Sequence, residues 1–327
     1  MKQEQKQNGQ NLIATGKVER PPFSLRVKKW DIVKNFGLYM LLLPSLIYLI
    51  VFAYLPMVGV VVAFQDYDPF KGIFGSEFVG FENFVFFFRG SEWLSVTVNT
   101  IYLNLLFIIT GTVASIAIAI MLTSIKGGIL CKTLQTFMTL PNFVSWPTVA
   151  LFAVAFLNGD GIINGLIQSF GGDKVNFYSN PDVWPGIFVI IRLWKGAGWG
   201  AIVYMAAIVG LDNSLYEAAL LDGCGKFKAI FKITLPLIKP TIVLLALMSI
   251  GNIFRGDFGM IYPFIGENAL LYPTTNVIDT YLFRAIKNSP YMGINMAIGL
   301  YQSLMGLILV FIANTLARKL APESAIF

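Results

Sequence analysis

The sequence predicts an all-α membrane protein with six transmembrane helices. Apolar runs of about 18 or more residues recur along the chain, which is the length a helix needs to cross about 30 Å of hydrocarbon. Of the 327 residues, 56% are hydrophobic and 13% are charged, and this charged share is about half that of an ordinary soluble domain. Most of the chain is therefore expected to lie in lipid. The first 35 residues are polar and carry no short apolar core, so no cleaved signal is expected there.

Each predicted span is a long apolar run between polar segments rich in Gly, Pro, Asn and Asp. Segments such as "QDYDPFKGIFGSEFVGFENF" mark the turns, and none of them is long enough to form a separate soluble domain. The predicted spans are Phe36 to Phe64, Val96 to Leu122, Leu134 to Leu157, Pro185 to Val209, Thr241 to Phe264, and Met292 to Leu316.

The distribution of lysine and arginine predicts the orientation. With the N-terminus inside, sixteen basic residues lie on the cytoplasmic side and five on the opposite side, and three lie within spans. Because cytoplasmic segments carry the excess of Lys and Arg, both termini are predicted to be cytoplasmic. The predicted organisation is a cytoplasmic tail at 1–35, a six-helix domain of the cytoplasmic membrane at 36–316 with a cytoplasmic loop at 212–240, and a cytoplasmic tail at 317–327.

Composition excludes several classes of function. The net charge of +6 and the pI near 9.2 follow from basic residues held on the cytoplasmic face, and without a basic stripe carrying interleaved aromatics no nucleic-acid partner is expected. The chain has no histidine and two cysteines, so no Cys/His metal cluster, no His-based triad and no cofactor are expected. Cys131 and Cys224 are predicted to face the cytoplasm, where thiols stay reduced.

The stretch "EAALLDGCGKFKAIFKITLPLIKP", Glu217 to Pro240, is a polar interruption on the predicted cytoplasmic face. Ser214, three residues before Glu217, has capping-box spacing and predicts a short helix from Ser214 to Leu221. Gly223 permits the positive φ that ends such a helix. The lysine-rich "KFKAIFKI" predicts a second short helix that stops before Pro236.

Two interpretations of this two-helix element remain open on its residues alone. Small side chains would let another protein approach closely, and acidic ones would anchor it, so the element can dock a partner. Alternatively it is an amphipathic hairpin on the lipid surface, which its lysines also suit. The candidate docking residues are Ser214, Glu217, Ala218, Ala219, Asp222 and Gly223.

The same stretch resembles the cytoplasmic signature of binding-protein-dependent ABC importer permeases. That signature is Glu-Ala-Ala, two residues, Asp-Gly, then about a dozen residues to a Leu-Pro and a final Pro. Cys224 replaces the usual small residue after Asp-Gly, and the aromatic usually found near Ile230 is one place later, at Phe231. The matching positions are Glu217, Ala218, Ala219, Asp222, Gly223, Leu235, Pro236 and Pro240.

Two further segments, "FVGFENF" and "YPTTNVIDTYLFRA", resemble the carbohydrate-uptake branch of that family. The resemblance implies a type I permease fold that works with a second homologous permease subunit, a dimer of ATP-binding subunits and an extracytoplasmic sugar-binding protein. ATP would be hydrolysed on another chain, since this sequence has no G-x-x-x-x-G-K-[ST] loop. The helix from Ser214 to Leu221 would bind in a cleft of an ATPase subunit, and Glu217 and Gly223 would be its main contacts there.

Polar and aromatic residues within two spans predict a solute pathway, because sugars bind aromatic faces and groups that take hydroxyls. A charged side chain at the bilayer centre costs at least about 2.5 kcal/mol unless it is paired or wet. Pairing of Asp257 with Arg192 or Lys195 and a solute-lining role are both open. The candidate pathway residues are Arg192, Trp194, Lys195, Trp199, Asn252, Arg255 and Asp257.

The charges also bear on the substrate. Taking the fifth span as one helix to Phe264, Arg255 and Asp257 point to different faces and cannot pair well. Some positive charge is then left over, and this favours an acidic oligosaccharide such as a uronate; the competing view is a neutral glycan. The rival class is a secondary transporter or channel, which would need its own coupling carboxylates within spans, and only Asp257 qualifies.

Overall fold

The computed structural model describes residues 35–125, 128–288 and 291–320. The predicted N-terminal tail, apart from its last residue, and positions 321–327 of the predicted C-terminal tail lie outside these ranges. The chain divides into two compact units, Met1–Val58 and Gly59–Phe327. The described part of the first unit is helix α3 (Phe36–Leu49), a π-helical turn (Ile50–Tyr54) and the start of a 3-10 segment (Leu55–Phe64). No residue of α3 is buried by the rest of the chain. A helix that is apolar on every face is typical of a membrane span, where lipid covers that surface.

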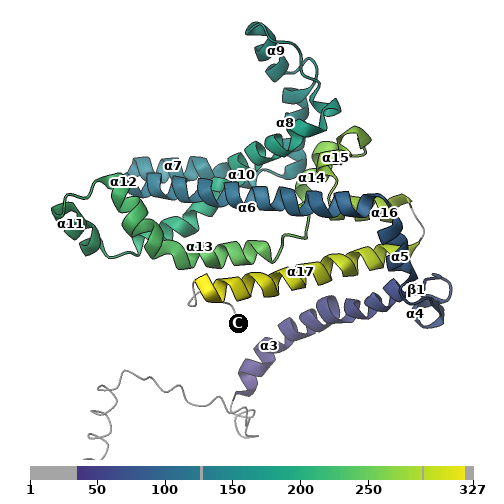
Figure 1. Ribbon diagram of the computed structural model, residues 1–327. Helices are drawn as coiled ribbons and strands as arrows, with labels where there is room; N and C mark the ends of the chain where they lie inside the picture. Colours follow the sequence, from purple (N-terminus) through teal and green to yellow (C-terminus); the bar gives the residue numbers. More distant parts are fainter. Residues whose placement is uncertain (1–34, 126–127, 289–290, 321–327) are drawn as a thin grey trace, which may run out of the picture. The chain divides into compact units, whose positions relative to one another are not determined.

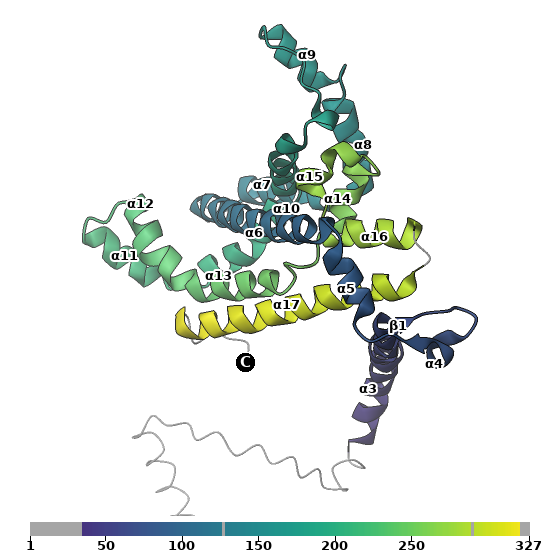
Figure 2. The ribbon, with the colours of Figure 1, turned by 45° about the vertical axis from the view of Figure 1, so that its right-hand side comes forward.

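Four long helices form the centre of the second unit. They are α6 (Glu92–Ser124), α10 (Trp184–Val209), α13 (Leu235–Ile250) and α17 (Met292–Leu320). Helix α10 packs along α6, and α13 contacts α6, α10 and α17 (Figures 1 and 2). Counting Phe36–Phe64, six helical segments of the described chain are long and apolar enough to cross a membrane. The six-span, all-α prediction is therefore confirmed, whereas the side on which the termini lie stays a prediction.

Small residues let α10 approach its neighbours at backbone distance. A Cβ built on Gly198 would lie 1.9 Å from the carbonyl oxygen of Met138, and one on Gly200 would lie 2.5 Å from the Ser115 hydroxyl. That hydroxyl donates to the carbonyl oxygen of Ala197 over 3.1 Å. Such close contacts replace the hydrophobic effect, which is weak between helices in lipid.

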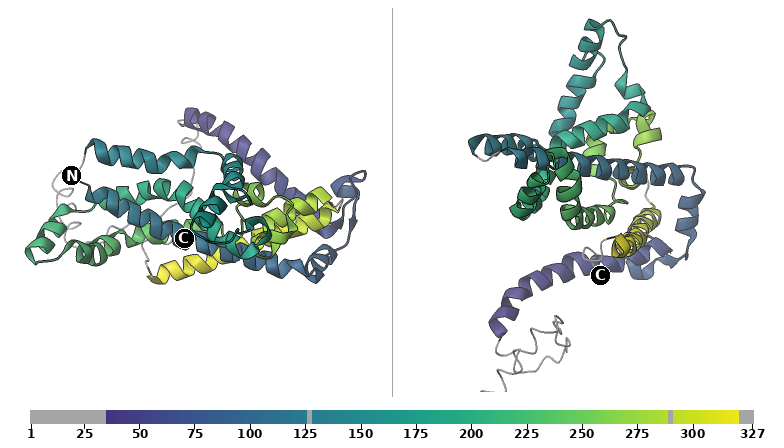
Figure 3. Two further views of the ribbon diagram at one scale, coloured as in Figure 1. Left: turned by 90° about the horizontal axis from the view of Figure 1, so that it is seen from above. Right: turned by 60° about the vertical axis from the view of Figure 1, so that its left-hand side comes forward.

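Shorter elements lie at the ends of the long helices. Strands β1 (Gln65–Asp66) and β2 (Glu77–Phe78) pair antiparallel, with Gln65 opposite Phe78. In Figures 1 and 3, α11 and α12 lie at one end of the bundle and α14 to α16 at the other. The short helices are α4 (Gly72–Gly75), α5 (Glu82–Arg89), α7 (Ile129–Thr139), α8 (Trp146–Leu157), α9 (Ile162–Ser169), α11 (Asn213–Leu221), α12 (Lys226–Ala229), α14 (Phe258–Ile265), α15 (Tyr272–Thr275) and α16 (Ile278–Asn288).

The third predicted span, Leu134 to Leu157, is not one helix. Helix α7 ends at Thr139, a 3-10 turn follows at Leu140–Phe143, and α8 begins at Trp146. Val144 and Ser145 are extended, and Pro147 stands in the first turn of α8, where proline is tolerated. The Ser145 hydroxyl caps α8 by accepting from the N–H of Thr148. The candidate span in this region is Trp146–Ser169 instead.

The fifth predicted span, Thr241 to Phe264, is wrong at both ends. Its helix begins earlier, because α12 continues through a π-helical turn (Ile230–Thr234) into α13, and it ends at Ile250. Residues 251–257 are then non-helical before α14 starts. Asn252, Arg255 and Asp257 therefore lie on a break between helices, so the premise that Arg255 and Asp257 share one helix was wrong.

The second short helix predicted in the loop does not stop before Pro236. Pro236 is the second residue of α13, and it lies inside a helix that began at Lys226. The π-helical turn just before it shifts the hydrogen-bond register. The lysine-rich segment is thereby joined to the fifth span as one continuous helix, Lys226–Ile250.

Candidate functional site

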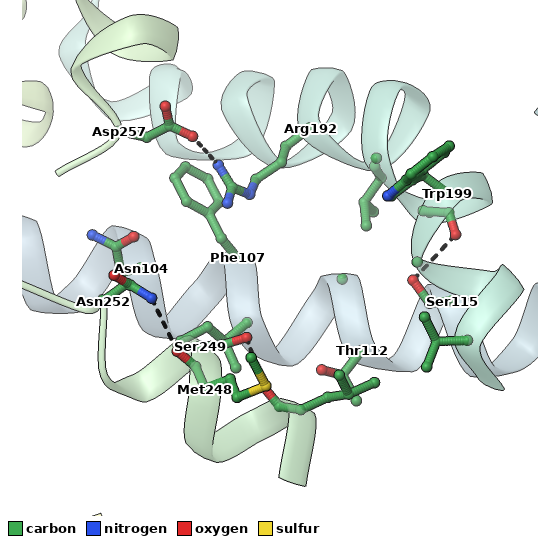
Figure 4. Close-up of a pocket in the computed structure, with 18 of the residues that line it drawn as sticks. Asn104, Phe107, Thr112, Ser115, Arg192, Trp199, Met248, Ser249, Asn252 and Asp257 are labelled. Carbon is green, nitrogen blue, oxygen red and sulfur yellow. Dashed lines mark hydrogen bonds and ion pairs between the residues drawn. The ribbon is translucent and has the colours of Figure 1, made fainter. Parts of the chain in front are cut away.

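A polar cavity of about 740 Å³ lies between α6, α10, α13 and segment 251–257. This volume is within the range of small-ligand sites, about 300–1,000 Å³. Figure 4 shows its wall of amides, hydroxyls and aromatic rings, with the Arg192–Asp257 pair toward one end and Trp199 toward the other. The polar and aromatic lining residues are Asn104, Phe107, Thr112, Ser115, Asn142, Arg192, Trp199, Tyr204, Ser249, Asn252, Arg255 and Asp257.

Helix α6 supplies a polar stripe that the sequence analysis did not select. Asn104, Gly111 and Ser115 line the cavity. Gly111 and Ser115 follow Asn104 by about two and about three helical turns, which places all three on one face. Thr112 belongs to the same stripe. This periodicity of polar and small residues within an apolar span is the signal that could have identified them.

Arg192 and Asp257 form an ion pair inside the cavity. The guanidinium donates to the Asp257 carboxylate over 2.5 Å, and it lies over the Phe107 ring at 4.7 Å. Asp257 also caps α14 by accepting from the N–H of Met260. The two side chains are 36% and 30% exposed, so both alternatives left open by the sequence apply at once: the charges are paired, and they line the cavity.

The lining of the cavity has an excess of positive charge because of Arg255. Its side chain is exposed and lines the cavity, and within the described ranges it makes no ion pair, although Asp279 is near enough for their charges to interact. The lining thus holds two cations, Arg192 and Arg255, against one carboxylate, Asp257. An anionic solute would be attracted to such a surface.

Lys195 and Trp194 do not line the cavity. Lys195 is buried at 7% exposure, its ammonium donates to the carbonyl oxygen of Asn142 over 2.6 Å, and it lies over the Trp146 ring at 5.1 Å. A cation placed on the free carbonyls where α7 and its 3-10 turn end stabilises that helix terminus. The geometry therefore gives Lys195 a place in the α7–α8 break, away from the candidate pathway.

The predicted docking element is an exposed helix with a different N-cap from the one expected. Asp212, rather than Ser214, caps α11 by accepting from the N–H of Ser214 over 2.9 Å, so the capping-box prediction was wrong. Asp212 stands immediately before the helix, whereas Ser214 is already its second residue, so the Asp212 carboxylate is the group placed to accept from a free N–H of the first turn. The same hydrogen bond holds the pKa of the Asp212 carboxyl below its ordinary value.

The C-terminal end of α11 matches the prediction. Gly223 has φ +73°, its N–H donates to the carbonyl oxygen of Leu220, and the N–H of Cys224 donates to that of Ala219. This double pattern is a Schellman motif, which needs a left-handed residue. At the other side of the element the Tyr216 hydroxyl lies 2.9 Å from that of Thr234, so α11 is tied to the helix that leads into α13.

A bundle of membrane-length helices around a polar cavity, with a short exposed helix at one end, defines a multi-pass membrane transport subunit. Residues 111–323 match the family described as binding-protein-dependent transport system inner membrane component, and the chain belongs to this family. It is therefore a permease subunit of an ABC importer and not itself a catalytic enzyme.

Relatives and solved structures support the same assignment. Protein LplB of Bacillus subtilis is 36% identical over 301 residues, covering 92% of each chain. The polygalacturonan/rhamnogalacturonan transport system permease protein YteP of the same organism is 37% identical over 89% of this chain and 91% of its own. A crystal structure of a bacterial ABC transporter involved in the import of the acidic polysaccharide alginate has a chain with a TM-score of 0.81 and 32% identity, covering 89% of this chain and 98% of that one. A second crystal structure holds the alginate transporter in complex with an alginate pentasaccharide-bound periplasmic protein.

Proposed function

We propose that this chain carries an acidic oligosaccharide across the cytoplasmic membrane into the cell, driven by ATP hydrolysis on a separate pair of ATP-binding subunits. The observation that carries the acidic character is the cavity lining, with Arg192 and Arg255 against Asp257. Two similar proteins point the same way, since YteP serves polygalacturonan and rhamnogalacturonan and the alginate transporter serves an acidic polysaccharide.

The proposed coupling surface is the exposed element that contains α11. Its side chains Glu217, Ala218 and Asp222 are exposed, and two apolar side chains beside them, Leu220 and Leu221, are 73% and 90% exposed. A contiguous apolar surface next to acidic groups suits a protein cleft. In the proposal, the Tyr216–Thr234 contact passes the motion of the ATPase to α13. The residues that bind the ATPase are Ser214, Glu217, Ala218, Ala219, Asp222 and Gly223.

The complete importer is proposed to contain a second homologous permease and an extracytoplasmic sugar-binding protein. The alginate importer complex, which includes a loaded periplasmic protein, supports this composition. The proposal is tested by purifying the tagged chain from its native membrane. Recovery with an ATP-binding subunit, and ATP hydrolysis stimulated by oligosaccharide-loaded binding protein, is expected; uptake that persists in cells lacking the ATP-binding subunit would instead indicate a secondary transporter or channel.

The proposed orientation, with both termini inside, predicts which sites an impermeant thiol reagent can reach. Single cysteines are introduced at Lys2, Lys174 and Glu267 in a background lacking Cys131 and Cys224. Labelling in intact cells is expected for positions 174 and 267, where the present side chains are exposed, and not for position 2. Labelling of position 2 without lysis would overturn the orientation.

The acidic-substrate proposal predicts a charge preference that depends on the cavity arginines. The parent is expected to be stimulated more strongly by uronate than by neutral oligosaccharides of matched length. Arg255→Gln should lower that preference about tenfold, the equivalent of about 1.4 kcal/mol, because its cation is not neutralised by an ion pair. Arg192→Gln should lower it as well, since it leaves Asp257 without its partner.

Arg89→Gln, at the exposed end of α5, is the matched control and should leave the preference unchanged. A parent that prefers the neutral sugar, or cavity variants with the parental ratio, would refute the acidic substrate and leave the importer assignment intact.

A further inference from the structure

Segment 251–257 divides its side chains between two environments. Ile253 and Phe254 are each 2% exposed and belong to an apolar cluster with Phe87, Val96, Ile278 and Ile298. Asn252, Arg255 and Asp257 line the cavity. A non-helical segment at this place is tolerated in a membrane protein only where its backbone is satisfied by other groups.

Side chains from three helices lie against that backbone. Gln302 of α17 donates to the carbonyl oxygen of Phe254 over 2.8 Å and also to the Asp279 carboxylate over 2.8 Å. The Asp279 carboxylate of α16 lies beside Gly256, 3.4 Å from where a Cβ on that residue would stand. Asn104 of α6 lies 3.5 Å from the carbonyl oxygen of Arg255, at the limit of a hydrogen bond. The Gln302–Asp279 pair thus binds the residue before Arg255 and lies beside the residue after it.

Gly256 explains why the pair can come so close. A Cβ at this position would lie 2.6 Å from the Val277 side chain and 3.4 Å from the Asp279 carboxylate. Only glycine allows the backbone to rest directly on the start of α16. Burial raises the pKa of the Asp279 carboxyl, while the Gln302 hydrogen bond opposes that rise. The carboxyl is thus partly desolvated although it does not line the cavity.

We propose that Gln302 and Asp279 are positioning residues of the solute pathway: they hold segment 251–257 so that Arg255 and Asp257 present their charges to the cavity, although neither Gln302 nor Asp279 lines it. This inference rests on the proposed function, because it explains how the charge selectivity of the cavity is set. Removing Gln302 frees the carbonyl of Phe254, and removing Asp279 takes away the carboxylate that orients Gln302. The segment is then expected to shift to find water or another partner.

A thiol assay tests the positioning without any substrate. A cysteine is placed at Asn252, which lines the cavity, in a background lacking Cys131 and Cys224. An anionic and a cationic water-soluble thiol reagent of similar size are compared, and the anionic one is expected to react about fivefold faster because of the excess positive charge. Gln302→Leu, which leaves every charge in place, should remove most of this preference, as Arg255→Gln does directly.

Transport kinetics provide the second measurement. Gln302→Leu and Asp279→Ala are expected to raise the concentration of loaded binding protein or oligosaccharide needed for half-maximal ATPase stimulation about tenfold, while changing the maximal rate less than about twofold. Asp279→Asn, which keeps an acceptor oxygen for Gln302, should recover part of the loss. Ser303→Ala is the matched control, since the exposed Ser303 hydroxyl bonds only to the carbonyl oxygen of Gly299 in its own helix.

Each outcome decides between positioning and ordinary stabilisation. If the folded fraction of the variants keeps the parental reagent preference, the inference is wrong, whatever the yield of protein. A fall in maximal rate at unchanged half-maximal concentration would also contradict it. If no oligosaccharide stimulates the parent, the proposed function fails, and the thiol assay still decides whether Gln302 and Asp279 position the segment.

Discussion

Replacing Gly223 with tryptophan is expected to abolish transport while leaving the protein folded and inserted. Gly223 adopts a left-handed φ of +73°, a Cβ added there would meet no atom of the described chain within 4 Å, and the position is exposed. The cost to the fold is therefore limited to backbone strain of about 1–2 kcal/mol. The tryptophan side chain would project from the exposed C-terminal end of α11. The proposed contact with the ATPase needs close approach there, so docking should fail.

Gly223→Ala separates the two effects, because alanine imposes the same left-handed strain without the bulk. The measurement is recovery of the ATP-binding subunit on the tagged permease, together with substrate-stimulated ATP hydrolysis. We expect the tryptophan variant to lose both and the alanine variant to keep most of each. Equal recovery and normal stimulation in Gly223→Trp would show that this end of α11 is not the docking seat.

Gly198→Ala is expected to lower the stability of the protein strongly, although the change adds one methyl group. That methyl carbon would lie 1.9 Å from the carbonyl oxygen of Met138 and 2.4 Å from its carbonyl carbon, whereas non-bonded carbon atoms rest at about 3.5–4.0 Å. Both atoms belong to backbone, so α7 and α10 must separate along their contact. Overpacking of this kind costs about 1–3 kcal/mol or more, a large part of a typical stability of about 5–15 kcal/mol.

The control is Gly186→Ala on the same helix, where an added Cβ meets nothing within 4 Å. Yield of monodisperse protein in detergent and the thermal unfolding midpoint are compared with those of the parent. Gly186→Ala should match or slightly exceed the parent, since alanine favours helix by about 1 kcal/mol over glycine. A Gly198→Ala variant with parental yield and midpoint would show that α7 is not packed on α10 at this distance.

Much of this protein could be predicted from sequence because the signals are local. The length and apolarity of the runs determine six membrane-length segments, and α10 (Trp184–Val209) begins and ends within one residue of its predicted place. The positive φ of Gly223 follows from the need of a helix end for a left-handed residue. The signature from Glu217 to Pro240 likewise indicated the family without any knowledge of packing.

Hydropathy could not locate the breaks, because an average over a window does not register where the backbone leaves the helix. The third span was placed across Pro141, and the fifth was carried to Phe264 through the turn that follows Ile250. In both places the interruption is held by side chains from distant segments: Lys195 donates to the carbonyl oxygen of Asn142, and Gln302 donates to that of Phe254.

The sequence by itself determined the apolar spans, the exposed signature and the presence of a few charges within a lipid-facing chain. Only the tertiary structure decided which of those charges pair, which line the cavity and which support a break. Arg192 pairs with Asp257, Arg255 lines the cavity without an ion pair in the described chain, and Lys195 caps the 3-10 turn that follows α7. The physical reason is that the cost of a charge in a membrane depends on which groups surround it. Those groups come from other helices, and only packing brings them together.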